Sequence, residues 1–220
     1  MSRRYRAGLI PMATAIAFAL AAPAAQAAEP HWYRCEEVLG GTLEAGCTSG
    51  GSGFTKVLVG ASPGTAVTTE GILAMKIGSS PSLECDVTDE GHIWNPGGAT
   101  GAAGEDSVTA FHFVCGGGGC PAPELRAFHL PWKSVLLAGP PITDRVSGIE
   151  IEVKCSGVFV DDVFGHLTPE FINGRNITHS YAKFTTGTGD LTDARSNLVT
   201  VTGDDEMSGP GGEGVLATTP

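Results

Sequence analysis

The chain has 220 residues, of which 24 are acidic and 13 are basic, so its formal charge at pH 7 is −11. This excess of acidic residues excludes nucleic acid and anionic membrane surfaces as partners, because both are negatively charged themselves. The length suits one domain with a buried core, and 32 glycines interleaved with apolar runs are typical of short strands joined by tight turns.

Residues 1–28 have the pattern of a cleaved signal peptide. Three arginines among the first six residues give a basic start, and an alanine-rich apolar stretch runs from Leu9 to Ala22. This stretch is shorter than the roughly 20 apolar residues of a membrane-spanning helix. We therefore predict a secreted single domain, residues 29–220, with no membrane insertion once the leader is removed. The leader takes three basic and no acidic residues with it, so the domain is acidic, with a formal charge of −14.

All elements predicted after the leader are strands, because no stretch has the spacing of a helix longer than a turn or two. The first element is a hairpin in which a turn at Gly40-Gly41-Thr42 places Cys35 opposite Cys47. Apolar and polar residues then alternate over 83–87 and over 111–115, which predicts strands with one face on a core.

The second half of the chain continues this pattern. Pro131 interrupts the apolar segment 125–137, which favours an edge strand or two successive strands over a helix. Alternation is clearest over 149–155, the Asn173-Gly174 step predicts a tight hairpin, and residues 198–202 form a β-branched run. Two glycine-rich stretches, 97–104 and 202–214, are interpreted as surface loops. The predicted fold class is an all-β antiparallel β-sandwich or barrel-like domain of about 10 to 12 short strands.

Six cysteines in an exported chain predict three disulfide bonds. A metal site is the alternative, but the spacings lack the Cys-x-x-Cys pairs of such sites. Four glycines between Cys115 and Cys120 allow a closed loop, and the first hairpin brings Cys35 and Cys47 together. We therefore predict the bonds Cys35–Cys47, Cys115–Cys120 and, by elimination, Cys85–Cys155.

No catalytic, cofactor-binding or metal-binding residue is predicted. The stretch 60–64 matches the Gly-x-Ser-x-Gly pattern of hydrolases, but Pro63 has no N–H for an oxyanion hole, so a turn is predicted there. The six histidines are dispersed. Acidic groups at 105–106, 161–162 and 204–206 are interpreted as solvated charge, and 86–91 resembles a calcium loop only faintly because its acids do not alternate.

The order and spacing of the cysteine-bearing segments resemble uncharacterised secreted proteins of high-GC actinobacteria, which have a disulfide-containing all-β domain of unknown function. The resemblance covers most of residues 35–219 and implies a secreted β fold, but it transfers no site residues. It rests on the Cys35…Cys47 hairpin, Leu83-Glu84-Cys85, Phe113-Val114-Cys115…Cys120, the segment 130–137 and Val153-Lys154-Cys155.

Two functions follow as expectations. The first is a non-enzymatic extracellular or cell-envelope protein that binds a glycan, a peptide or an envelope component through its loops. The alternative is a secreted hydrolase that acts on glycans or other extracellular substrates with a pair of carboxylates. The absence of a recognisable nucleophile, base or metal pattern favours the binding protein. The expected partner is an extracellular ligand of unknown identity, and no cofactor is predicted.

Overall fold

The computed structural model describes residues 28–38, 47, 53–117, 119–174, 180–187 and 189–219. Within these ranges the chain forms 14 strands and two short 3-10 helices, so the predicted all-β class is confirmed and the strands are more numerous than expected. The predicted leader lies outside the described residues, apart from its last position. The described ranges contain no helix that is long and apolar enough to cross a membrane.

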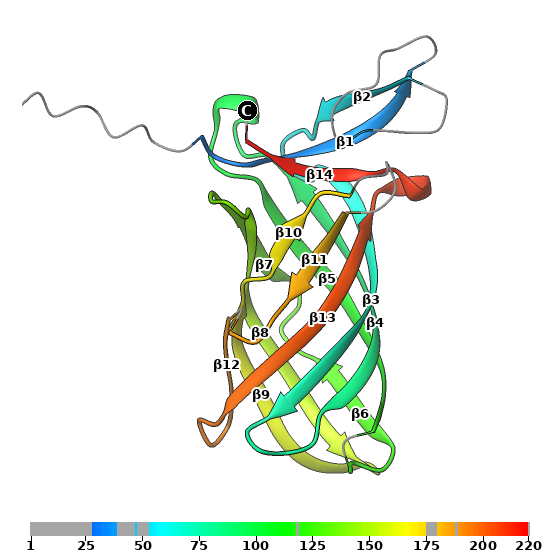
Figure 1. Ribbon diagram of the computed structural model, residues 1–220, viewed down its shortest axis with the longest axis vertical. Helices are drawn as coiled ribbons and strands as arrows, with labels where there is room; N and C mark the ends of the chain where they lie inside the picture. The colour runs from blue at the N-terminus through cyan, green and yellow to red at the C-terminus, as the bar shows by residue number, and fades with distance from the viewer. Residues whose placement is uncertain are drawn as a thin grey trace, which may run out of the picture.

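Eight antiparallel strands close into a barrel (Figure 1). The last strand returns to the first through a ladder that runs from Val199 opposite Ile77 to Ser208 opposite Thr68. Of the two predicted architectures, the barrel is therefore the correct one. In order around the barrel, the strands are β3 (Thr65–Ile77), β4 (Leu83–Trp94), β5 (Glu105–Gly117), β7 (Trp132–Leu137), β8 (Thr143–Cys155), β9 (Val158–Leu167), β12 (Gly189–Asp193) and β13 (Leu198–Ser208).

Three further strands complete the wall. At one end, β10 (Glu170–Ile172) and β11 (Ser180–Phe184) bridge β8 and β13. Near the other end, β6 (Pro123–Ala127) pairs with β8 along the stretch that follows the β7 pairing. Because Pro131 lies between β6 and β7, the prediction of two successive strands around this proline is confirmed.

Closure of β13 on β3 depends on two glycines. A Cβ atom at Gly71 would lie 2.2 Å from the backbone oxygen of Asp204, and one at Gly203 would lie 2.1 Å from that of Ile72. Gly203 also has a positive φ of 138°. Glycine at such positions lets neighbouring strands approach closely and coil into a barrel. The predicted surface loop over 202–214 is wrong in its first part, because β13 continues to Ser208.

A second, three-stranded sheet covers one end of the barrel (Figure 1). This cap sheet has the order β14 (Val215–Thr218), β1 (His31–Val38) and β2 (Gly53–Leu58). Trp32 and Val59 are fully buried and pack against Ile93 and Leu136 of the barrel. The buried Asn95 amide accepts a hydrogen bond from Trp32 N and donates to the Trp32 and Val59 oxygens, each at 2.8 Å. One side chain thus ties the cap sheet to the barrel.

Replacing Asn95 with alanine is expected to lower the free energy of unfolding by about 3 kcal/mol, because the buried Trp32 N–H and Val59 oxygen lose their partner, whereas the Trp32 oxygen keeps the Val59 N–H. Urea denaturation of the two proteins measures the difference. Asn197→Ala is the control, since Asn197 is exposed and its amide contacts Asp193 in a surface turn. We expect the control to lose less than about 1 kcal/mol. Equal losses in the two variants would contradict this role of Asn95.

All six cysteines form disulfides, as predicted, but two of the three predicted pairings are wrong. Cys35–Cys47 is confirmed, although Cys35 lies opposite Lys56 in its ladder and not opposite Cys47. Cys85–Cys155 and Cys115–Cys120 are replaced by Cys85–Cys115 and Cys120–Cys155. Neighbouring strands β4 and β5 place Cys85 directly opposite Cys115, and the following glycine loop carries Cys120 to the end of β8.

Of the two predicted turns, one falls on residues that the structure does not describe and the other is replaced by a wider connection. The Gly40-Gly41-Thr42 turn lies outside the described residues. The tight hairpin predicted at Asn173-Gly174 is wrong: this step does join two antiparallel strands, but Ile172 pairs with Tyr181, so eight residues separate the paired positions. Residues 175–179, which were expected to continue as a strand, are also outside the described ranges.

Candidate functional site

The inward-facing positions of the barrel strands form three layers. Along β4, the inward residues run from Val87 in a large apolar cluster, through Asp89, to Ile93 beneath the cap sheet. Along β13, Asp205 lies in the same way between Val201 and Met207. A polar layer therefore separates two apolar ones. We call it the acid layer, and its members are Thr69, Asp89, Asp106, Ser134, Asp144 and Asp205, all of them buried.

A chamber inside the barrel extends along the acid layer and the large apolar cluster. The space between its lining atoms comes to ≈ 950 Å³ with open solvent included, and the volume that admits the centre of a water-sized sphere is ≈ 100 Å³. One water needs roughly 10 to 15 Å³ by the latter measure, so the chamber has room for several waters or one small organic molecule. Most of its walls are apolar, with rings from Phe111, Phe113 and Trp132, and the four aspartates of the acid layer also line it.

The four aspartates form two pairs. In the first, the Thr69 hydroxyl contacts a carboxyl oxygen of Asp89 and, at 2.9 Å, one of Asp205, while the two carboxyls lie within hydrogen-bonding reach of each other. In the second pair, the Ser134 hydroxyl donates to Asp144, and Asp106 is within hydrogen-bonding reach of Asp144. Two carboxyls in contact hydrogen bond only when one of them carries a proton, so this geometry favours one proton in each pair.

Burial is the main cause of the raised pKa values in the acid layer. It raises the pKa of Asp205 to about 8, and the nearby Asp89 charge adds to this effect. The pKa of Asp106 rises well above its usual range, through burial and the neighbouring Asp144. The pKa values of Asp89 and Asp144 rise to about 6, because hydrogen bonds from Thr69 and Ser134 partly offset burial. At neutral pH each pair therefore has one charged and one protonated member.

Two carboxyl oxygens in this layer are buried without a hydrogen-bond partner: Asp106 Oδ2 and Asp205 Oδ1. Their residues are 6% and 5% exposed and both line the chamber. A buried polar atom without a partner destabilises the fold by about 1 to 3 kcal/mol, so each such atom in a folded protein needs an explanation.

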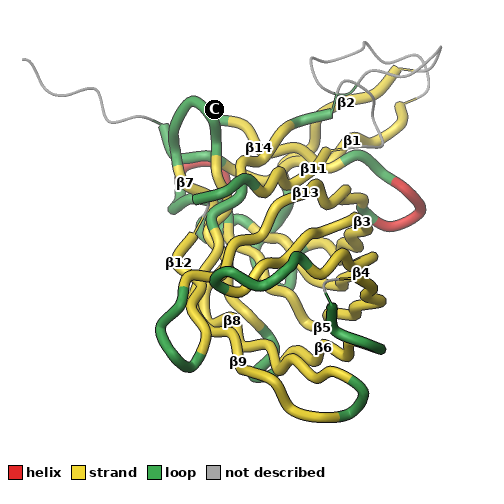
Figure 2. The backbone as a smooth tube through the Cα atoms, turned by 60° about the horizontal axis from the view of Figure 1, so that its bottom comes forward, coloured by secondary structure: helices red, strands yellow, loops and turns green. Residues whose placement is uncertain are grey.

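The barrel wall has a seam between β5 and β6. These strands lie side by side, but the described residues form no backbone ladder between them. Side chains fill the seam, among them Phe113 and Leu125, which also line the chamber. The disulfides Cys85–Cys115 and Cys120–Cys155 close its lower end, which belongs to the base of the barrel, brought forward in Figure 2.

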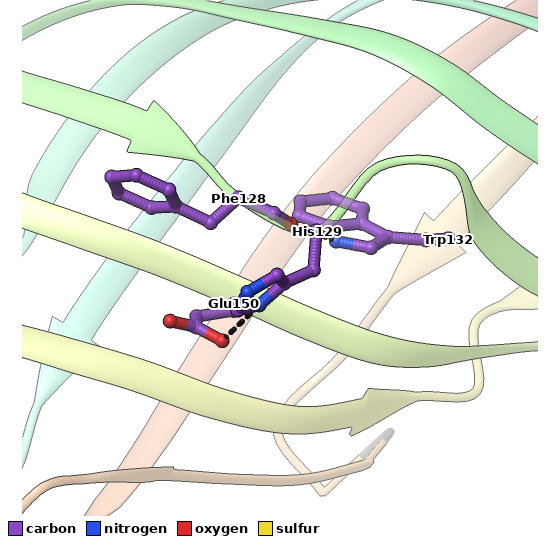
Figure 3. A network of polar contacts seen from close by, with 4 residues as sticks. All are labelled: Phe128, His129, Trp132 and Glu150. Carbon is purple, nitrogen blue, oxygen red and sulfur yellow. Dashed lines mark hydrogen bonds and ion pairs between the residues drawn. The ribbon is translucent and has the colours of Figure 1, made fainter.

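The loop after β6 is fixed at the upper end of this seam (Figure 3). Trp132 Nε1 donates to the Phe128 oxygen at 2.8 Å, and the His129 ring meets Glu150 of β8 at 2.6 Å. His129 was one of six histidines to which the sequence assigned no role. Its ring lies on the outside of the wall, and no histidine of the described residues lines the chamber.

The predicted solvated acids include buried members of the site. Asp106 and Asp205 face the interior and Asp161 is buried as well, so the interpretation of these three as surface charge is wrong, whereas Asp204 is exposed as expected. Residues 86–91 form part of strand β4 and not a loop, and the described residues hold no group of three or more His, Cys, Asp or Glu arranged for a metal ion. The stretch 60–64 is a turn, as predicted.

A signal for the acid layer was present in the sequence. Asp89 continues the inward series Leu83, Cys85 and Val87, and Asp205 continues that of Val199 and Val201. An acidic residue at an inward, otherwise apolar position of a strand is unusual, because a buried charge without a partner destabilises the fold. Asking whether each acid falls at an inward or an outward position of its predicted strand would have identified both residues as buried.

Comparison with models of protein families, with curated proteins and with solved structures finds no match to this chain. The resemblance to secreted actinobacterial proteins therefore stays a prediction.

Proposed function

We propose that this protein is exported and binds a small, mostly apolar molecule inside its barrel. The observation that carries this proposal is the chamber with apolar walls, whose cavity volume is ≈ 100 Å³ by the measure that a water-sized sphere gives. Binding sites for small molecules are concave, mostly apolar and hold a few placed polar groups, and eight-stranded barrels suit one such ligand. The proposed site is thus the barrel interior, whereas the sequence led us to expect binding through the loops.

Export is supported by the leader pattern of residues 1–28 together with three disulfides that use all six cysteines. Disulfides form and persist mainly in oxidising compartments outside the cytoplasm. The alternative, a hydrolase of glycans, has weaker support. Paired carboxylates of glycosidases stand roughly 5 to 9.5 Å apart around the scissile bond, whereas here the pairs are in hydrogen-bonding contact within the barrel.

The base and the seam are the proposed route for the ligand. The cap sheet covers the other end with fully buried residues such as Trp32. At the base, a second hollow lies between Leu83, Val153 and the Cys120–Cys155 disulfide, and it shares Met75 with the chamber. The seam between β5 and β6 leads to the same chamber walls. The described residues of these two strands form no backbone ladder, so no such hydrogen bonds would have to break for a ligand to pass.

Binding is tested with N-phenyl-1-naphthylamine, an uncharged aromatic probe whose fluorescence rises in apolar surroundings. We expect saturable binding with one probe per protein. Val108→Phe, which adds a ring to the chamber wall, should weaken binding by about tenfold or more, since lost burial of a few apolar groups has that effect.

The matched control is Val114→Phe, the same substitution on the same strand at a residue that is 73% exposed. This variant should bind as the natural protein does. Absence of saturable binding to the natural protein, or an equal loss in both variants, would refute the chamber as the binding site.

A further inference from the structure

We propose that the ligand of the chamber is an organic cation, whose protonated nitrogen is held by Asp106 and Asp205 while its apolar body fills the space beside them. This inference rests on the proposed function and names the class of molecule that the site accepts.

The first support is the negative charge of the acid layer. The Thr69 hydroxyl has one proton but contacts both Asp89 and Asp205, so this trio needs a further proton on a carboxyl to satisfy both contacts. The Ser134 hydroxyl likewise donates to Asp144, and the Asp144 carboxyl lies close to that of Asp106. One proton per carboxyl pair leaves one negative charge per pair, so two charges face the chamber.

The second support is that no side chain balances these charges. The chamber lining among the described residues includes no lysine, arginine or histidine. An isolated charge in apolar surroundings costs several kcal/mol, and burial without a partner is stable only where something neutralises it. A bound cation would supply that charge.

The third support is the pair of unpartnered oxygens. Asp106 Oδ2 and Asp205 Oδ1 are buried, and no N–H or hydroxyl group of the described residues donates a hydrogen bond to either oxygen. Once their carboxyls have lost a proton, these oxygens are acceptors, and an ammonium group brings up to three N–H donors. Hydrogen bonds between a charged donor and a carboxylate are shorter and stronger than neutral ones.

The walls favour an organic cation over a metal ion. Phe111 and Trp132 lie with ring centroids 5.5 Å apart, and Phe111 and Phe113 at 4.6 Å. Aromatic faces attract ammonium groups, and they also bury the apolar body of a ligand. Trp132 precedes Ser134 of the acid layer by one inward position on β7, so rings and carboxyls belong to adjoining parts of one wall.

The test compares three probes of one shape: 1-adamantylamine, 1-adamantanol and adamantane-1-carboxylate, titrated by calorimetry into the exported protein at pH 7. The amine is a cation at this pH, the alcohol is neutral and the acid is an anion. We expect the amine to bind about tenfold to a hundredfold more tightly than the alcohol, and the anion to bind more weakly than either.

The double variant D106N/D205N should remove the advantage of the amine and leave binding of the alcohol nearly unchanged. The control is D86N/D204N, in which the same change is made at exposed residues of β4 and β13. A second readout needs no variant: amine titrations in buffers of different ionisation enthalpy should show release of a fraction of a proton per amine bound, because the cation lowers the pKa of the carboxyls that still hold protons, and alcohol titrations should show none. The groups that set this release are the four aspartates, on β4, β5, β8 and β13, and Glu70 on β3, which acts on Asp205.

The outcomes separate the two proposals. Equal affinity for amine and alcohol, with no proton release, overturns the cation and leaves apolar binding standing. Failure of all three probes and of N-phenyl-1-naphthylamine overturns both. Displacement of the amine by millimolar calcium, together with calcium binding that D106N/D205N abolishes, would assign the layer to a metal ion and overturn the organic cation.

Discussion

Raising the pH from 5 to 8 should destabilise the ligand-free protein by about 3 kcal/mol or more. The cause is the acid layer, where burial raises the pKa of Asp205 to about 8 and those of Asp89 and Asp144 to about 6. In the unfolded chain these groups titrate near their ordinary values of about 4. Between pH 4 and 8 the folded state therefore binds more protons than the unfolded state.

The sign follows from this difference in bound protons. Where the folded state holds more protons, the free energy of unfolding falls as the pH rises. The stabilising effect of the protonated aspartates is complete near pH 4 and is lost as the pH passes through about 6 and then about 8. Each pKa unit of difference corresponds to about 1.4 kcal/mol, so even one of these groups has a measurable effect.

Asp205→Asn should flatten this pH dependence. Asparagine resembles the protonated acid in shape and stays neutral, so the variant should exceed the natural protein in stability at pH 8 by about 2 to 4 kcal/mol. Asp204→Asn is the matched control, because Asp204 is the exposed neighbour on the same strand. The measurement is urea denaturation at pH 5, 6.5 and 8 with the disulfides intact. Stability that is constant or increasing over this range would contradict the buried, proton-bearing acid layer.

Gly203→Ala should have an equally large effect, through the closure of the barrel. The added methyl group would meet the backbone oxygen of Ile72 at 2.1 Å, and the φ of 138° is unfavourable for a residue with a side chain. Because a backbone atom cannot move aside as a flexible side chain does, β13 would have to separate from β3. We expect a loss of about 3 kcal/mol or failure to fold.

The control for this substitution is Gly116→Ala. Gly116 lies in β5, and a Cβ atom there would meet nothing within 4 Å. Its replacement should change stability by less than about 1 kcal/mol. Thermal unfolding and the yield of folded protein are the measurements. If the Gly203 variant were as stable as the Gly116 variant, the close approach of β13 to β3 would be refuted.

Much of the fold could be predicted because strand formation is a local property. Alternation at 83–87 and 149–155 predicted β4 and β8, and Pro131 marked the break between β6 and β7. Closure is not local. Whether β13 returns to β3 depends on coiling at positions such as Gly71 and Gly203, and their close contacts lie across strands that are far apart in sequence.

The same distinction explains the two wrong disulfides. Glycines between Cys115 and Cys120 make a closed loop possible, but the register of β4 with β5 decides the actual partner. Pairing along the whole ladder sets that register, so the sequence near either cysteine does not reveal it. The acid layer is different, because the phase of Asp89 within its strand was readable from the sequence.

The most direct test of the ligand chamber is a crystal structure of the protein grown with 1-adamantylamine. The account predicts electron density for the cage inside the barrel, beside Phe111 and Trp132, with the nitrogen within about 3 Å of Asp106 Oδ2 or Asp205 Oδ1. A chamber filled by collapsed side chains, or a probe bound only on the outer surface, would contradict it.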